Sequence, residues 1–150
     1  MDYTGVVRIA FDRGDREQIE AELAELGTVR EDPEALTATL DWLADALEGI
    51  PAAPAPASDL RLVATPFAHD VLAAIARVPA GRTISYAELA AAAGRPRAVR
   101  AAAHVCATNP LPLVIGCHRI VRSDGTAGEY GGGRRLKAHL IARERAAAQR

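Results

Sequence analysis

The chain has 150 residues, of which 49% are hydrophobic and 25% charged, as in globular proteins that bury a core in one domain or two small ones. No apolar run approaches the ~20 residues that cross a bilayer, and the acidic, polar N-terminus is unlike a signal peptide. We therefore expect a cytoplasmic protein without membrane contact. Two cysteines are too few for a disulfide scaffold or a cysteine-rich zinc site, and we expect no metal.

The two halves of the chain carry opposite charge. Residues 1–70 hold five Arg and fifteen Asp or Glu, a net charge of −10, whereas residues 71–150 hold thirteen Lys or Arg and four Asp or Glu, a net charge of +9. A basic half favours a polyanionic partner. The alternative is that the two halves attract each other, and charge alone does not decide between these interpretations.

The N-terminal third predicts one strand and two helices. β-Branched residues favour a strand over residues 4–11. An apolar face opposite a row of acids predicts a helix over residues 15–26. A second helix is predicted over residues 32–48, because Asp32 is a suitable N-cap, a proline follows it and leucines form an apolar stripe.

Residues 51–58, PAAPAPAS, are too rich in proline for a helix or a central strand and predict a linker. We place the domain boundary there, with a small N-terminal domain and linker over residues 1–58 and a second domain over residues 59–150. The second domain begins with a predicted short strand over residues 60–63 and a helix over residues 66–78.

The next segment is typical of a helix-turn-helix. Ser85 and Glu88 are spaced as a capping box, which predicts a short Ala-rich helix ending at Gly94. A second helix is predicted over residues 95–108, and two short helices joined by a tight glycine-containing turn form this motif. Three arginines lie at the predicted start of the second helix: Arg95, Arg97 and Arg100.

The remaining residues surround a cysteine. An apolar strand is predicted over residues 113–115 and leads directly into Cys117. Downstream we expect a turn at residues 123–125, a flexible triple-glycine loop at residues 131–133 and a basic helix over residues 134–148.

Cys117 is a candidate nucleophile because a neighbouring base or cation favours the reactive thiolate. Adjacent strand residues point to opposite faces, so we expect His118 to reach the Cys117 sulfur through a water, with Glu144 as the carboxylate that holds the imidazole. The alternative is that Cys117 is a small buried hydrophobe, as most free cysteines are. Cys106 is interpreted as a packing residue.

The stretch NPLPLVIGCHRIVRSDGTAGEYGGG resembles the active-site signature of the O6-alkylguanine-DNA alkyltransferases, which reads Asn-Pro-x-Pro, three apolar residues, Pro-Cys-His-Arg and a later Tyr-Gly-Gly-Gly. The upstream GRTISYAELAAAAGRPRAVRAAA resembles the helix-turn-helix of the same family, and the likeness extends over about residues 66–145. The resemblance implies single-turnover transfer of an alkyl group from O6-alkylguanine in duplex DNA to Cys117, by a monomer that needs no cofactor.

The resemblance also implies individual roles. Cys117 would accept the alkyl group, His118 would act as a base through a water, and Glu144 would orient it. Asn109 would brace the turn before the active-site strand. Arg100 would fill the gap that the flipped nucleotide leaves in the duplex. The other residues implied to contact DNA or the flipped guanine are Tyr86, Arg97, Arg119, Tyr130, Gly131 and Lys137.

Two residues depart from the family pattern. Leu72 stands where the family commonly has Trp, and Gly116 replaces the proline that precedes the nucleophile. Glycine leaves the backbone less restricted than proline does. We therefore expect Gly116→Pro to speed transfer and leave DNA affinity nearly unchanged, provided that the local φ suits proline.

Taken together, these patterns predict an α/β (α+β) protein with a small, reduced N-terminal strand-and-helix lobe and a helical C-terminal domain that carries the helix-turn-helix. Two other functions remain open at this point. One is a non-catalytic sensor of alkylated DNA, and the other is a plain helix-turn-helix DNA-binding regulator.

Overall fold

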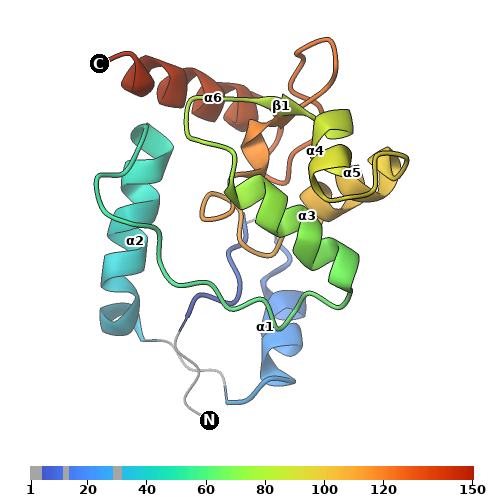
Figure 1. Cartoon of the computed structure of the whole chain (residues 1–150). Coiled ribbons are helices and arrows are strands. Elements are labelled where there is room, and N and C mark those ends of the chain that lie inside the picture. Colours follow the sequence, from blue (N-terminus) through green and yellow to red (C-terminus); the bar gives the residue numbers. More distant parts are fainter. Residues whose placement is uncertain (1–4, 12–13, 29–31) are drawn as a thin grey trace.

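The computed structural model describes residues 5–11, 14–28 and 32–150, and it is mostly helical with one small sheet (Figure 1). Within these residues no helix is long and apolar enough to cross a membrane. The mixed helix-and-strand class predicted from sequence is confirmed. The elements in chain order are α1 (Arg16–Ala24), α2 (Pro33–Glu48), α3 (Pro66–Ala76), β1 (Ile84–Ser85), α4 (Tyr86–Ala92), α5 (Val99–Ala107), the 3₁₀ helix η1 (Cys117–Arg119), β2 (Ile120–Val121) and α6 (Arg134–Ala148).

The strand predicted over residues 4–11 is wrong for the part described, and Thr4 lies outside the described residues. Residues 5–11 form an extended segment with one isolated parallel bridge, between Val6 and Ser58. The Val6 N–H donates to the Ala57 carbonyl at 2.8 Å. A longer ladder does not form because the partner segment is the proline-rich linker, whose prolines lack N–H donors.

The strand predicted over residues 60–63 is also wrong, and the segment is a turn. The Asp59 carboxylate accepts the Arg61 N–H at 3.0 Å and is paired with the Arg61 guanidinium, while the Val63 N–H donates to the Leu60 carbonyl at 2.9 Å. A local side-chain acceptor of this kind competes with strand pairing.

The two N-terminal helices form as predicted, with small differences at their ends. The Asp32 carboxylate caps α2 by accepting the Ala35 N–H at 3.1 Å. Figure 1 shows α2 beside the C-terminal half of α6, and the two helices are in contact. In contrast α1 has no buried residue and lies at the far end of the molecule.

The main core lies where α3, α4 and α5 pack against one another. Fully buried aliphatic side chains from these helices, and from the segments around η1 and α6, fill the core. The residues of the N-terminal part are only partly buried against it, so the C-terminal part forms most of the core. The division at residue 58 stays a prediction, because Ile9, Phe11 and Trp42 pack against this same core. The largest fully buried apolar side chains are Val71, Leu72, Ile75, Leu89, Leu111, Ile120 and Leu140.

The helix-turn-helix forms from α4 and α5, with Gly94 in the turn at φ +78°, a conformation that favours glycine. The second helix begins at Val99 and not at Arg95, which corrects the sequence prediction. Residues 95–98 form a turn, closed by the Ala98 N–H donating to the Arg95 carbonyl at 2.8 Å. The proline that follows Arg95 disfavours a helical backbone at that residue.

The only sheet in the described part of the chain is a parallel pair, with Ile84 opposite Ile120 and Ser85 opposite Val121. The helix-turn-helix makes up most of the crossover between these two strands. The pairing sets Tyr86, the first residue of α4, beside β2, which directly follows η1 and its Cys117. It therefore joins the predicted DNA-binding motif to the predicted nucleophile.

The capping box is expected to hold this junction. The Ser85 hydroxyl accepts the Glu88 N–H at 3.2 Å, and the Ser85 N–H donates to the Glu88 carboxylate at 2.7 Å. Because Ser85→Ala removes a satisfied helix cap, we expect a loss of about 1 kcal/mol in unfolding free energy, measured by urea denaturation. Ser123→Ala, at an exposed turn, is the control and is expected to change stability little. Equal stability of the two variants would contradict this role.

Candidate active site

The predicted strand over residues 113–115 is wrong, and Cys117 instead follows a tight turn. Leu113 has φ +73°, and the Ile115 N–H donates to the Leu111 carbonyl at 2.8 Å. The Asn109 side chain closes the turn from both sides: its amide donates to the Ile115 carbonyl at 2.9 Å, and its oxygen accepts the Leu111 N–H at 3.0 Å. Asn109 thus supplies bonds that the neighbouring prolines cannot make.

Gly116 forms an inverse γ-turn before the cysteine. Its φ is −67° and its ψ is 57°, and the Cys117 N–H donates across it to the Ile115 carbonyl at 2.7 Å. This φ is the one that proline adopts, so the backbone conformation itself does not require glycine.

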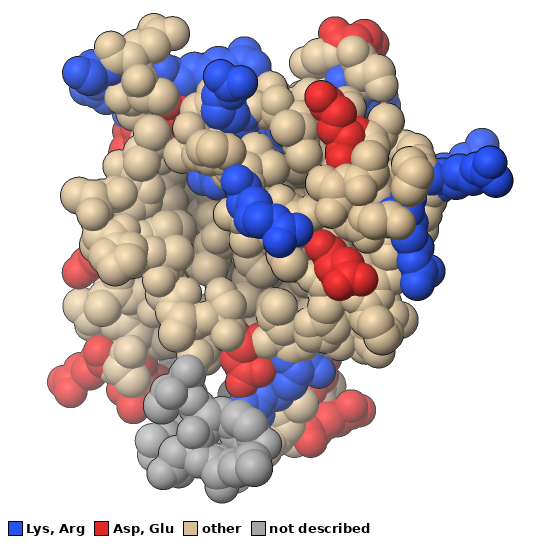
Figure 2. All heavy atoms as spheres, in the orientation of Figure 1, with Lys and Arg blue, Asp and Glu red and all other residues tan. Residues whose placement is uncertain are grey.

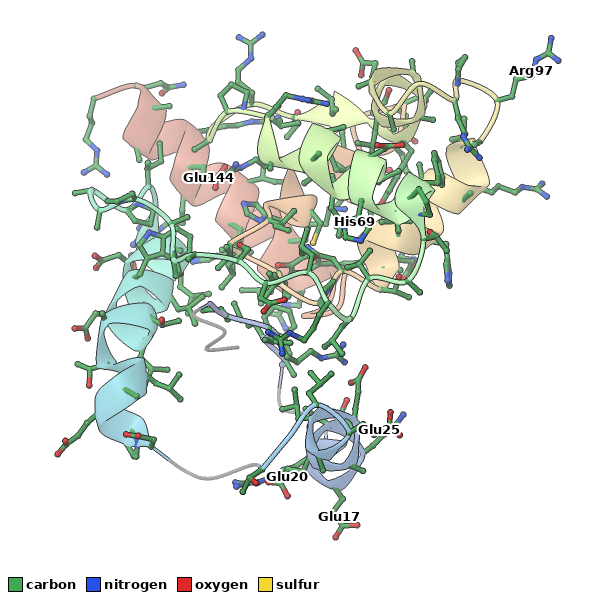
Figure 3. The ribbon with its side chains drawn as sticks, turned by 60° about the horizontal axis from the view of Figure 1, so that its bottom comes forward. Glu17, Glu20, Glu25, His69, Arg97 and Glu144 are labelled. Carbon is green, nitrogen blue, oxygen red and sulfur yellow. The ribbon has the colours of Figure 1, made fainter. Side chains whose placement is uncertain are left out.

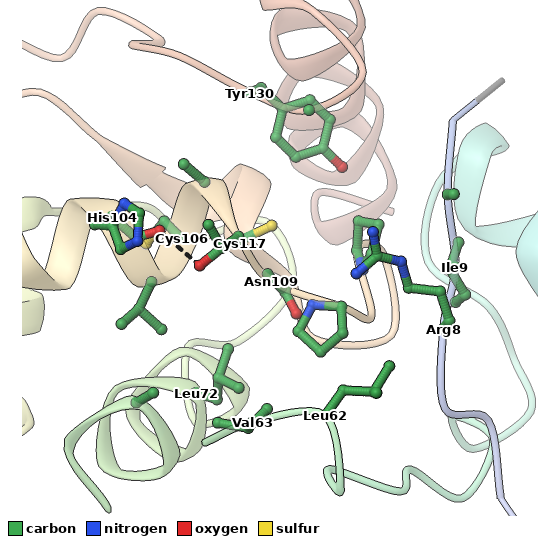
Figure 4. A pocket seen from close by; sticks show the side chains of 18 of the residues that line it. Arg8, Ile9, Leu62, Val63, Leu72, His104, Cys106, Asn109, Cys117 and Tyr130 are labelled. Carbon is green, nitrogen blue, oxygen red and sulfur yellow. Dashed lines mark hydrogen bonds between the residues drawn. The ribbon is translucent and has the colours of Figure 1, made fainter. Parts of the chain in front are cut away.

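Cys117 is 3% exposed and lines a cavity of about 700 Å³ (Figure 4). Burial raises the pKa of its thiol, while the Asn109 side chain and the positive charges of Lys137 and Arg119 oppose that rise. The resting thiol is therefore protonated at neutral pH, and a reaction at this sulfur needs a base.

His118, 2% exposed, lies next to the cysteine in η1 and is paired with Glu144 at 2.8 Å from Nε2 to Oε1. A carboxylate only accepts, so Nε2 carries the proton and Nδ1 holds a free electron pair in the neutral ring. Nδ1 is buried and has no hydrogen-bond partner among the described residues. The imidazole is thus arranged to accept a proton at Nδ1.

The Glu144 carboxylate, 4% exposed, accepts hydrogen bonds from two separate segments of the chain. Besides His118 it accepts the Gly81 N–H at 3.0 Å and the Arg119 guanidinium, from Nη2 at 2.8 Å and from Nε at 3.0 Å. Burial alone would raise the pKa of Glu144, but the bonds from His118 and Arg119, together with that from Gly81, bring it down to about 2.

The sequence interpretation placed Arg119 among the residues that contact DNA, and the structure corrects this. Its guanidinium turns inward, where it pairs with Glu144 and donates from Nη1 to the Val78 carbonyl at 2.9 Å. The two-nitrogen hydrogen bonding of a guanidinium to a carboxylate is stronger than a hydrogen bond between neutral groups, and this holds the Arg119 side chain inside. Sequence reasoning gave no signal for Val78 or Gly81, because both act through their backbone.

Tyr86 and Lys137 contact each other, and neither is among the residues that line the cavity. Lys137 is 1% exposed, and its Nζ donates to the Tyr86 hydroxyl at 3.3 Å and to the Glu129 carbonyl at 3.4 Å. Burial lowers the pKa of Lys137, and burial raises that of Tyr86 to about 12. The phenol therefore stays protonated at neutral pH. Within the described residues, no cluster of His, Cys, Asp or Glu could hold a metal ion.

Tyr130 and Gly131 line the cavity. The Tyr130 hydroxyl is buried without a partner among the described residues, and its ring meets Phe11 edge-on at 5.6 Å between centroids. The N-terminal segment completes the wall: Figure 4 shows Arg8 and Ile9 across the cavity from Cys117. Sequence reasoning missed this wall, because no motif marks a segment that reaches the site only through folding.

The predicted DNA-binding arginines lie outside the cavity and are exposed. Arg97 projects from the turn before α5, as Figure 3 shows, and Arg100 lies in the first turn of α5. Arg95 lies 5.1 Å from the centre of the Phe67 ring. In Figure 2 most basic side chains lie in the upper half, where Figure 1 places α4, α5 and α6.

Comparison with known proteins identifies the family. The domain described as 6-O-methylguanine DNA methyltransferase, DNA binding domain, matches residues 66–146, which include Cys117 and both helices of the helix-turn-helix. The chain belongs to the 6-O-methylguanine DNA methyltransferase family. The Bifunctional transcriptional activator/DNA repair enzyme Ada of Escherichia coli is 49% identical over 80 residues, which are 53% of this chain and 23% of that protein.

A methylated-DNA–protein-cysteine methyltransferase of Methanothermobacter thermautotrophicus is 46% identical over 80 residues, 53% of this chain and 44% of that protein. The match thus spans less than half the length of these two relatives. Among solved structures, OGT of Mycobacterium tuberculosis in complex with DNA has 33% identity and a TM-score of 0.70, over 77% of this chain and 70% of that one. The O6-methylguanine-DNA methyltransferase of Pyrococcus kodakaraensis has 27% identity and a TM-score of 0.65, over 95% and 87% of the two chains.

The Glu144 pairing in this family member is expected to make stability fall in acid. Its pKa in the folded chain is about 2, below the ordinary 4.5, so the pairing stabilises the fold above about pH 4.5 and is lost as pH falls toward about 2. The upper limit is on the order of 3 kcal/mol, less what water screens. Urea denaturation at a series of pH values measures it.

In Glu144→Gln the unfolding free energy should depend less on pH between about pH 4.5 and pH 2. Glu129→Gln is the control, because Glu129 is exposed and pairs only at the surface with Arg134. An acid limb that is as steep in Glu144→Gln as in the native chain would show that other groups carry it.

Proposed function

We propose that this protein removes an alkyl group from O6-alkylguanine in duplex DNA by transferring it to Cys117, once per molecule. The observation that carries the proposal is a buried cysteine at a cavity, followed directly by a histidine. Its Nε2 is held by a buried carboxylate, and its Nδ1 has no partner among the described residues. The family assignment supports the same chemistry. All the residues invoked come from one chain, so a monomer suffices.

Binding to duplex DNA would use the helix-turn-helix. Arg97 in the turn before α5 and Arg100 in the first turn of α5 are both exposed. The helix α5 also exposes the small side chains of Ala101 and Ala107, which permit close approach to the minor groove. Contacts between these arginines and DNA phosphates would release counterions, so the affinity for undamaged duplex should fall steeply as the salt concentration rises. The alkylated base would leave the stack, and Arg100 would take its place.

The chemical step would be a displacement at the alkyl carbon. The Cys117 proton moves to His118 Nδ1, through a bridging water, while Glu144 stabilises the imidazolium that forms. The sulfur attacks the carbon, and the bond from that carbon to O6 breaks. O6 returns to a carbonyl as guanine takes up at N1 the proton that the imidazolium releases through solvent. The product is a thioether, which does not hydrolyse readily, so the cysteine is not regenerated.

Four further residues would help to orient the base. The protonated Tyr86 hydroxyl can donate a hydrogen bond to guanine, with Lys137 behind it. Tyr130, whose hydroxyl has no partner among the described residues, lines the cavity together with Gly131. Holding the alkyl carbon close to the sulfur is the main source of acceleration that such a site can supply.

The acceptor is testable by mass. Incubation with O6-methylguanine duplex is expected to add one methyl group to the intact protein, and peptide mapping should place it on Cys117. Cys106→Ala should keep the transfer and Cys117→Ala should abolish it, because Cys106 is a second thiol at the same cavity and is the matched control. A protein that binds the duplex without gaining mass would instead be a sensor or a regulator, and a methyl group on Cys106 would reassign the acceptor.

Arg100 is expected to act on flipping more than on binding. Arg100→Ala should slow methyl transfer by about tenfold or more, because the emptied position in the duplex is no longer filled. Affinity for undamaged duplex, followed by fluorescence anisotropy, should fall only about as much as in Arg97→Ala, the neighbouring exposed arginine. Equal effects of the two substitutions on transfer would leave Arg100 as an ordinary phosphate contact.

A further inference from the structure

Gly116 lies against the guanidinium of Arg119. A Cβ placed on Gly116 would lie 2.8 Å from the Arg119 Cζ and 2.9 Å from its Nε and Nη1, closer than real side chains approach. The backbone of Gly116 does not itself call for glycine, since its φ of −67° suits any residue and its N–H donates no hydrogen bond within the described part of the chain. The missing side chain is therefore what the site requires.

The guanidinium cannot easily move aside. Nε and Nη2 donate to the Glu144 carboxylate and Nη1 to the Val78 carbonyl, so all three nitrogens are engaged, and the side chain is only 17% exposed. Swinging it out would leave a buried carboxylate with fewer donors and a carbonyl without its partner, which is costly in a low-dielectric interior. Arg119 is thus fixed by Glu144 on one side and by the backbone of Gly116 on the other.

We propose that Arg119 is a positioning residue for the Glu144–His118 pair, and that Gly116 is its packing counterpart, so that the two residues act as one unit. This rests on the proposed alkyl transfer. Arg119 and His118 share Oε1 of Glu144, and Arg119 also holds Oε2. A shift of the guanidinium rotates the carboxylate and with it the imidazole whose Nδ1 must take the thiol proton.

The proposal reverses one expectation from the sequence. The φ of Gly116 does suit proline, which alone would favour a faster, more rigid site. However, the Cβ of proline would occupy the space against the guanidinium. Gly116→Pro and Gly116→Ala should therefore both slow transfer, and for the same reason.

A double-mutant cycle tests the coupling. Single-turnover methyl transfer is measured at saturating duplex for the native chain, Gly116→Ala, Arg119→Lys and the double variant. Lysine keeps the charge but loses the planar fork that grips both carboxylate oxygens. Each single change should slow transfer by about tenfold or more, with duplex affinity unchanged, because misplacement by fractions of an ångström costs rate more than binding. The double variant should be no slower than Arg119→Lys alone.

The pH profile separates positioning from mere stability. The groups that face Glu144 are His118 and Arg119 from η1, the Gly81 N–H, and Tyr130 from the loop before α6. Arg119 is among the groups that lower the pKa of Glu144, so the transfer rate of Arg119→Met should fall at a higher pH than that of the native chain, over a pH range in which urea denaturation shows both chains to be folded. Arg122→Met, an exposed arginine three residues along, should leave the profile in place. Should Arg119→Met not fold, Arg119→Lys carries the test through the cycle.

The outcomes are distinct. If the native chain transfers the methyl group, two results would overturn the proposal. One is a double variant whose decrease in rate is the product of the two single decreases, and the other is a normal rate in Gly116→Ala. If the native chain transfers nothing, the proposed function fails, and the coupling is then read from urea denaturation of the same four proteins. There Gly116→Ala should destabilise the native background and not the Arg119→Lys background, and equal destabilisation of both would overturn the inference.

Discussion

The buried carboxylate of Glu144 is the interaction on which the site depends. A lone carboxylate in this position would be strongly unfavourable, and it persists because His118, Arg119 and the Gly81 N–H all donate to it. These donors come from two separate segments, and the carboxylate itself comes from α6. Satisfying one charge therefore fixes three parts of the chain relative to one another, and the tautomer of the imidazole follows from the same bonds.

The second constraint is the short parallel pair of β1 and β2. It is only two residues long, yet it places the start of α4 beside the segment after η1. Because η1 begins at Cys117, the pairing also holds the start of the helix-turn-helix near this cysteine. Lys137 from α6 reinforces this junction by donating to the hydroxyl of Tyr86, the first residue of α4.

The turn before the cysteine shows how irregular backbone is stabilised at such a site. Two prolines remove donors, and Leu113 adopts a left-handed conformation, an arrangement that would be unfavourable alone. Asn109 compensates by donating and accepting within the turn. The γ-turn at Gly116 then aims the cysteine into the cavity, and the absence of a side chain there leaves room for Arg119. The turn and the Glu144 network are thus adjacent, and Arg119 joins them, because its guanidinium lies against Gly116 and donates to Glu144.

The sequence by itself determined the helices, the capping box and the helix-turn-helix, because caps and periodicity are local signals. It offered Glu144 only as a candidate partner for His118, and the tertiary structure brings the two side chains together. The sequence did not determine the strands: residues 5–11 and 60–63 have strand-like composition but lack a partner that can form a ladder. Only the tertiary structure decided that Arg119 faces inward and that residues 8–11 wall the cavity. Both outcomes depend on long-range contacts, a buried charge that must be neutralised and an apolar segment that must be covered, and neither leaves a periodic trace in the chain.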